Sequence, residues 1–220
     1  MSGLRLTFDE KGLIPVIVQD RLTGEIRMFA FATLEAVRNT LQTGRATFWS
    51  RSRGELWEKG RTSGNDIRVT RVLVDCDSDC LVYSSEPHGN SCHTGAPSCF
   101  FQTIDGEDVV QASGQPQTLL AELEALLEAR KASSAGASYT KSLYEKGPTA
   151  IAAKVREEGN ELAHAVEAES DSRVVSEAAD VVYHVLVGLR SRSIPLRLVL
   201  SELARRLGTS GHEEKARRPQ

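Results

Sequence analysis

Three aspartates alternate with two other residues in the sequence DCDSD, which occupies positions 75–79. Because alternate residues of an extended strand point to the same face, we expect Asp75, Asp77 and Asp79 to share one face and Cys76 to occupy the other. Three carboxylates so close together repel one another unless a hard cation lies among them, and Mg²⁺ or Ca²⁺ takes oxygen ligands of this kind. The segment lacks the glycine and the distal glutamate of a calcium-binding loop. The alternation therefore favours a divalent-cation site, with an exposed acidic edge strand as the alternative.

Two more cysteines, Cys92 and Cys99, lie on either side of a Gly/Pro turn, and His93 follows the first of them. With Cys76 they offer three thiolates, and three protein ligands with an open fourth position are typical of a catalytic zinc. Cys80 could instead complete a closed structural site with four cysteines, since on strand parity it projects to the same face as Cys76. Spacing alone leaves the catalytic and the structural zinc equally open. His93 is the candidate general base beside the metal; the alternative is a surface histidine in a turn.

Two pairs of acids lie three residues apart in segments with helical patterning, Glu158 with Glu161 and Glu177 with Asp180. Residues at this spacing are neighbours on one helix face, where two acids repel, so a functional role requires cations. Two such pairs on facing helices of a bundle would make a four-carboxylate Mg²⁺ site, the usual partner of a pyrophosphate. The alternative is a solvated helix face, but the valines and alanines around the second pair argue against it.

The N-terminal half must position the first group of residues, and its patterning predicts strands with one helix. A helix is expected over 33–41, with Thr33 as its cap and Gly44 at its end. The short apolar runs that predict strands are 13–20, 26–32, 46–50, 68–74 and 80–84.

The C-terminal half must position the acid pairs, and its periodicity is helical from Thr118 onward. Further helices are expected over 148–169, 171–192 and 196–207. We therefore expect two domains, one mainly-β α+β and one an all-α helical bundle. Their expected bounds are 1–107 for the first domain, 108–117 for a linker, 118–208 for the second domain and 209–220 for a disordered tail.

The composition is that of an ordinary globular protein, with 26% charged and 40% hydrophobic residues in a chain of 220. A net charge of −3 gives no general attraction to nucleic acid or to an anionic membrane. The first residues lack the apolar region of a signal peptide, and the apolar stretch 181–189 is too short to span a bilayer. We therefore expect a cytoplasmic protein whose cysteines are reduced and bind metal or pack in a core.

Five blocks of the N-terminal half, spread over residues 10–102, together resemble phosphoribosyl-AMP cyclohydrolase of histidine biosynthesis in order and spacing. They are FWSRSR at 48–53, LWEKG at 56–60, TSGN at 62–65, DCDSD at 75–79, and CHTG and SCF between 92 and 100. The resemblance implies a homodimer whose zinc sites are built from both chains, with Cys80 outside the metal shell. The implied ligands are Cys76, Cys92 and Cys99 for Zn²⁺, and Asp75, Asp77 and Asp79 for Mg²⁺.

The implied reaction opens the adenine ring between N1 and C6 with zinc-activated water, which suits the three-thiolate site. The substrate carries two phosphates, and Arg51, Arg53 and Lys59 are candidates to hold them, since arginine pairs with phosphate in a bidentate manner. The alternative for these three is a solvated basic strand. The chain departs from the family pattern at Ala96-Pro97, where many relatives carry two basic residues.

The C-terminal half resembles phosphoribosyl-ATP pyrophosphatase, one of the all-α nucleotide pyrophosphohydrolases, over residues 118–208. The matching residues run from SYT at 138–140 through KVREE at 154–158 to EAADVVYH at 177–184. The resemblance implies catalytic Glu158 and Glu161, an auxiliary acid at Glu157, and phosphate contacts at Lys146 and Lys154. The implied Mg²⁺ ligands are Glu158, Glu161, Glu177 and Asp180.

Both resemblances in one chain imply a bifunctional hydrolase for the second and third steps of histidine biosynthesis. The C-terminal domain would release pyrophosphate from phosphoribosyl-ATP, and the N-terminal domain would then open the ring of phosphoribosyl-AMP. A rival of another class is a zinc-stabilised binding module fused to a helical dimerisation domain. That rival leaves the alternating aspartates and the acid pairs unexplained. A narrower rival is that only one half is active.

Overall fold

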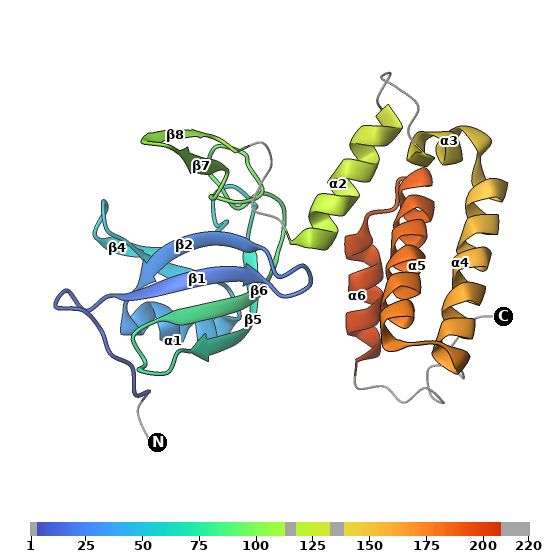
Figure 1. The fold of residues 1–220 in the computed structure, drawn as a ribbon. Helices are drawn as coiled ribbons and strands as arrows, with labels where there is room; N and C mark the ends of the chain where they lie inside the picture. The colour runs from blue at the N-terminus through green and yellow to red at the C-terminus, as the bar shows by residue number, and fades with distance from the viewer. Residues whose placement is uncertain (1–3, 113–117, 133–138, 208–220) are drawn as a thin grey trace. The chain divides into compact units, whose positions relative to one another are not determined.

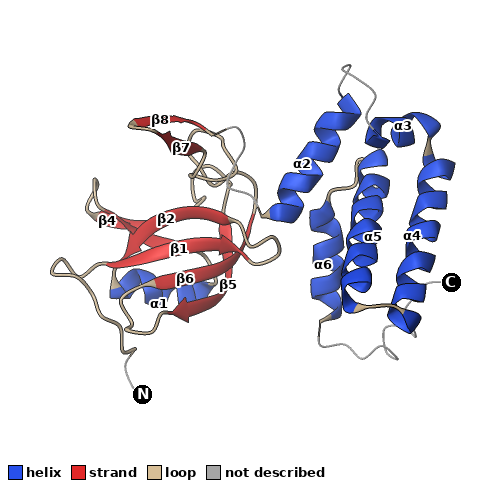
Figure 2. Ribbon diagram, viewed as in Figure 1, coloured by secondary structure: helices blue, strands red, loops and turns tan. Residues whose placement is uncertain are grey.

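The computed structural model describes residues 4–112, 118–132 and 139–207. The chain divides between Thr118 and Leu119 into two compact units, and each has its own core. The described strands belong to the N-terminal unit and helices α2 to α6 to the C-terminal unit (Figure 2). The two-domain prediction of a β-rich α+β fold and a helical bundle is confirmed.

A six-stranded sheet in the order β4-β3-β2-β1-β6-β5 forms the N-terminal unit, with α1 against it (Figure 1). Strand β1 pairs in antiparallel fashion with β2 and in parallel with β6. The bounds are β1 Ile14–Asp20, β2 Ile26–Ala32, α1 Leu34–Thr43, β3 Thr47–Ser50, β4 Glu55–Glu58, β5 Ile67–Val74 and β6 Leu81–Pro87.

Alternation and capping explain the elements that the sequence predicts well. In β1 the buried residues Ile14, Val16 and Val18 alternate with half-buried ones, so one face of the strand packs against α1. The Thr33 hydroxyl accepts a hydrogen bond from the Ala36 amide at 3.2 Å, and α1 ends at Gly44 with φ of 70°. Both predicted helix ends are therefore confirmed.

The segment 75–80 is a tight turn between β5 and β6, so the prediction of an extended strand there is wrong. One carboxylate oxygen of Asp75 accepts hydrogen bonds from the Asp79 and Cys80 amides, both at 3.0 Å. Ser78 adopts a left-handed conformation with φ of 66°. An aspartate side chain that binds backbone amides in this way competes with the strand ladder and stabilises a turn.

A separate hairpin, β7 Gln102–Asp105 with β8 Asp108–Gln111, follows the sheet, and every residue in it is exposed. The sequence predicts neither strand, and β8 occupies the first part of the expected linker at 108–117. Ile104 and Val109 face each other across the Gly106 turn, so strand-forming residues outweigh the polar composition of the segment. Residues 113–117 of the expected linker lie outside the described residues.

The described residues of the C-terminal unit form five helices, around a core of Leu127, Leu143, Ile151, Leu186 and Val187. Their bounds are α2 Leu119–Ala132, α3 Tyr139–Lys146, α4 Pro148–Ala168, α5 Asp171–Ser191 and α6 Leu196–Arg206. Pro148 opens α4 at its first helical position, where the missing amide hydrogen costs nothing.

The sequence does not predict α3 as a separate helix. The expected tail at 209–220 lies outside the described residues. In the described part of the chain, no helix is both long and apolar enough to cross a membrane.

Candidate active sites

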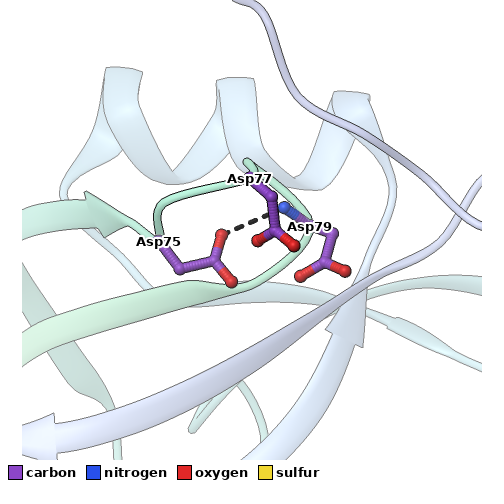
Figure 3. A group of neighbouring side chains, drawn as sticks. All are labelled: Asp75, Asp77 and Asp79. Atoms are coloured by element: carbon purple, nitrogen blue, oxygen red, sulfur yellow. Dashed lines mark hydrogen bonds between the residues drawn. The ribbon is translucent and has the colours of Figure 1, made fainter.

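The turn between β5 and β6 gathers Asp75, Asp77 and Asp79, which we call the acidic turn. Their carboxylate oxygens lie within 4.8 Å of one another and all three residues are exposed (Figure 3). The amide of Cys80 is the main reason that the pKa of Asp75 is lowered, whereas the hydrogen bond to Asp75 and the charge of Asp77 raise the pKa of Asp79. Three converging carboxylates of this kind suit a hard divalent cation.

A loop after β6 brings Cys92 and Cys99 together beside β2. The Cys92 amide donates to the Ala96 carbonyl at 3.0 Å, and the Cys99 amide donates to the Arg27 carbonyl in β2 at 2.9 Å. The Ser98 hydroxyl donates to the Ile26 carbonyl at 2.8 Å. The Cys99 end of the loop is thus held to β2, the Cys92 end is closed onto the loop itself, and the two thiols lie close enough to interact.

The two thiols differ in acidity. Desolvation opposes ionisation of the buried Cys92, but hydrogen bonds from Thr94, whose hydroxyl lies 3.1 Å from the sulfur, together with those from Cys99 and the His93 amide, outweigh it and lower the pKa. Desolvation and the negative charge of Cys92 raise the pKa of Cys99 to about 11. A cation shared by both sulfurs would favour the ionised form of each, so the pair suits a thiophilic metal.

A cavity of about 650 Å³ opens at this thiol pair. Its wall includes His93, Lys59 and Arg53, together with the rings of Phe29 and Trp57. His93 is exposed, with Nδ1 3.9 Å from the Cys92 sulfur. The cavity thus combines thiols, a histidine, basic groups and aromatic rings, which suits a nucleotide.

Cys76 does not line this cavity; it is exposed in the acidic turn. Among the described residues, the three cysteines form no cluster of potential metal ligands within one chain. Cys80 is half-buried, and desolvation, followed by the charge of Asp75, raises the pKa of its thiol. Because 75–80 is a turn, its side chains do not alternate as in a strand, and the prediction that Cys76 and Cys80 share one face loses its basis.

The three candidate phosphate contacts occupy different environments. Lys59 is buried, and desolvation lowers its pKa although the nearby thiols Cys99 and Cys92 act in the opposite direction. Arg51 and Arg53 are exposed in the turn between β3 and β4, so they are solvated in a turn rather than in a strand, whereas the buried Lys59 does not fit the solvated alternative. Arg53 pairs with Glu55 at 3.1 Å, and the Arg51 guanidinium lies 4.3 Å from the centre of the Phe31 ring.

In the C-terminal unit, α4 and α5 bring together Glu158, Glu177 and Asp180, which we call the helical acid cluster. Their carboxylate oxygens lie within 4.8 Å of one another; Glu158 and Glu177 are buried and Asp180 is exposed. Glu161 lies outside this set of three, but partial desolvation and the charges of Glu158 and Glu177 raise its pKa. The prediction that acids from two helices face each other is therefore correct for these three residues.

Two basic side chains balance the helical acid cluster. Lys154 Nζ lies 2.8 Å from Glu158 and 3.0 Å from Glu157, and its pKa is raised by those hydrogen bonds. Arg173 lies 2.5 Å from Glu177. Sequence reasoning missed Arg173, although its position four residues before Glu177 is a helical ion-pair spacing.

Family models match the two units separately. The model for phosphoribosyl-AMP cyclohydrolase matches residues 28–101, and the model for phosphoribosyl-ATP pyrophosphohydrolase matches residues 120–207. The first match contains the thiol pair and the acidic turn, and the second contains the helical acid cluster.

Several relatives resemble the chain over nearly its whole length, and each carries the name histidine biosynthesis bifunctional protein HisIE. The protein from Halalkalibacterium halodurans is 42% identical, over 91% of this chain and 95% of its own length. The proteins from Caldanaerobacter subterraneus subsp. tengcongensis and Aquifex aeolicus are each 41% identical, over 91% and 92% of this chain and 96% and 98% of their own lengths. The chain therefore belongs to the HisIE family of bifunctional histidine biosynthesis proteins.

Proposed function

We propose that the C-terminal unit hydrolyses phosphoribosyl-ATP to phosphoribosyl-AMP and pyrophosphate, and that the N-terminal unit then opens the adenine ring by attack of zinc-activated water at C6. These are the second and third steps of histidine biosynthesis. The proposal rests on one observation above all: each unit matches a different hydrolase family and contains its own group of potential metal ligands.

In the helical site, Glu158, Glu161, Glu177 and Asp180 would hold Mg²⁺, which supplies positive charge to phosphate oxygens. Water adds to the α-phosphorus and the bond from that phosphorus to the bridging oxygen breaks, so pyrophosphate leaves with the bridging oxygen. Glu158 or Glu161 would take the proton from the water, since both carboxylates belong to the same group of acids. Lys154 and Arg173 lie beside the acids and can pair with the phosphates.

In the N-terminal site, Cys92 and Cys99 would hold zinc together with Cys76 of a second copy of the chain. The donor set fits, since two thiols meet in the cavity and Cys76 is exposed for another chain to reach. This arrangement requires a homodimer, which we infer. Placement in the cytoplasm stays a prediction.

Zinc bound there would supply the Lewis acidity that lowers the pKa of a bound water to about 7. In the balanced reaction the water oxygen ends on C6 as a carboxamide, the C6–N1 bond breaks and N1 takes up a proton. His93 is the candidate to move that proton, because it lines the cavity next to Cys92. Lys59 and Arg53 also line the cavity and can pair with phosphate, with Arg51 close by in the same turn as Arg53.

The acidic turn would hold Mg²⁺ on Asp75, Asp77 and Asp79. The convergence of the three carboxylates supports this assignment; the hydrogen bond to Asp75 and then the charge of Asp77 raise the pKa of Asp79, and a divalent cation would offset that charge.

The full chain, purified without chelator, is expected to carry about one zinc per subunit, because three thiolates bind zinc tightly. Metal analysis by plasma mass spectrometry would measure it, alongside ring opening of supplied phosphoribosyl-AMP. A zinc content near zero in protein that opens the ring would contradict the three-thiolate site.

Cys80→Ser is expected to keep its zinc and to open the ring within about threefold of the parent rate, because a change outside the metal shell has a small effect. Zinc content and ring opening should be measured on the same preparation. Loss of zinc from this variant would mean that Cys80 is a ligand and that the site is a closed structural one.

A further inference from the structure

His184 is a buried histidine of α5 for which the reaction above has no role. It is 4% exposed and lies one helical turn after Asp180. Its Nδ1 lies 2.9 Å from the backbone carbonyl oxygen of Asp180 and 3.6 Å from a carboxylate oxygen of Glu158. Its Nε2 lies 3.0 Å from the hydroxyl of Tyr139 in α3. Both ring nitrogens are therefore engaged.

The partners of the ring decide where its hydrogen lies. A carbonyl oxygen can only accept, so Nδ1 must carry the hydrogen that it donates to Asp180. In the neutral imidazole Nε2 is then an acceptor, and the Tyr139 hydroxyl donates to it. The same Nδ1–H faces Glu158, at a distance that makes the interaction electrostatic rather than a direct hydrogen bond.

Glu158 also has a basic partner in Lys154, which differs from His184 in how firmly its side chain is held. Lys154 reaches Glu158 from the same helix on a flexible stem, and its side chain is 26% exposed. His184 instead reaches Glu158 from the facing helix, with its ring fixed at both nitrogens. Next to it, the Tyr183 and Thr140 hydroxyls lie 2.6 Å apart, so α3 is attached to α5 at two consecutive residues. Of the two basic side chains beside Glu158, His184 is therefore the one held in a fixed orientation.

We propose that His184 is a positioning residue of the pyrophosphate-releasing site, which directs the Glu158 carboxylate toward the bound Mg²⁺. This inference rests on the proposed function of the helical acid cluster. Groups that support a metal-binding side chain from behind commonly change metal affinity or activity 10- to 100-fold when they are removed. His184 is placed to act on Glu158 in that way without itself touching the substrate.

The test compares His184→Leu with His184→Asn in the full chain. Leucine removes both nitrogens, whereas the asparagine amide can place an N–H close to the position of Nδ1. Mg²⁺ binding would be measured by calorimetry without nucleotide. All chains would carry Asp77→Asn and Asp79→Asn, so that the acidic turn contributes no heat. Pyrophosphate release and thermal unfolding would be followed in parallel.

We expect His184→Leu to weaken Mg²⁺ binding and to lower kcat by about 10- to 100-fold, and His184→Asn to recover both to within about threefold. The matched control is His164→Leu, because His164 is an exposed histidine of α4 with its nearest carboxylate, Glu169, at 3.7 Å. The control should bind Mg²⁺ with the same affinity as the chain that carries only Asp77→Asn and Asp79→Asn.

Unchanged Mg²⁺ binding in a folded His184→Leu would overturn the inference and leave the proposed function intact. Equal losses in the leucine and asparagine variants would also overturn it, since they would indicate a packing role. If the parent chain neither bound Mg²⁺ nor released pyrophosphate, the proposed function itself would fail.

Discussion

Asp180→Ala is expected to lower pyrophosphate release from phosphoribosyl-ATP by a hundredfold or more, while phosphoribosyl-AMP supplied directly is still opened at close to the parent rate. Asp180 is the exposed member of the helical acid cluster, whose carboxylates lie within 4.8 Å of one another. Removing one ligand leaves the metal, and hence the phosphate charge, less well held, which costs roughly 3 kcal/mol of transition-state stabilisation. Ring opening is spared because its proposed residues belong to the other unit.

Each variant should be given each substrate and both products followed. Asp171→Ala is a matched control, because Asp171 is an exposed aspartate of the same helix that lies outside the acid cluster. A folded Asp180→Ala that had lost ring opening would contradict the assignment of two separate sites.

Cys92→Ser is expected to give the opposite result: pyrophosphate is released, but phosphoribosyl-AMP accumulates and the zinc content falls close to zero. Despite desolvation, hydrogen bonds from Thr94, Cys99 and the His93 amide together lower the pKa of the buried Cys92 thiol, which favours binding as a thiolate. A serine hydroxyl stays neutral and does not replace a thiolate ligand. We expect ring opening to fall by about a hundredfold or more, the scale on which loss of metal activation acts.

His93→Ala separates chemistry from metal binding at the same cavity. It should retain zinc and lose ring opening, since His93 is assigned proton transfer rather than ligation.

For Cys92→Ser, retained zinc together with normal ring opening would contradict the prediction and show that Cys92 is not a ligand.

The sequence predicts those features that depend on short-range patterns. The alternation in β1 and the Thr33 and Gly44 ends of α1 follow from strand pleat and helix capping. The convergence of Glu158, Glu177 and Asp180 follows from helical spacing on two neighbouring helices. In each case the relevant contacts lie within a few residues along the chain, or on facing helices of a small bundle.

Other features depend on contacts that the sequence pattern does not contain. Asp75 binds backbone amides, so the aspartates converge through a turn rather than through strand alternation. Cys76 does not line the cavity of Cys92 and Cys99, and the spacing of the cysteines along the chain cannot predict that separation. His184 lies in the segment that resembles the pyrophosphatase family, but its partners Tyr139 and Glu158 belong to α3 and α4. Those contacts depend on how the helices pack, which the sequence pattern does not give.

Three of the polar residues of α5 that serve the helical site, Glu177, Asp180 and His184, are three and four positions apart. An α-helix turns about 100° and rises about 1.5 Å for each residue, so a single inserted or deleted residue between them would swing one group to another side of the helix. This stretch of α5 is therefore more sensitive to a change in length than to many changes in residue type. The exposed turn at Gly106 carries no such phase requirement, so the two regions should differ sharply in the insertions that they tolerate.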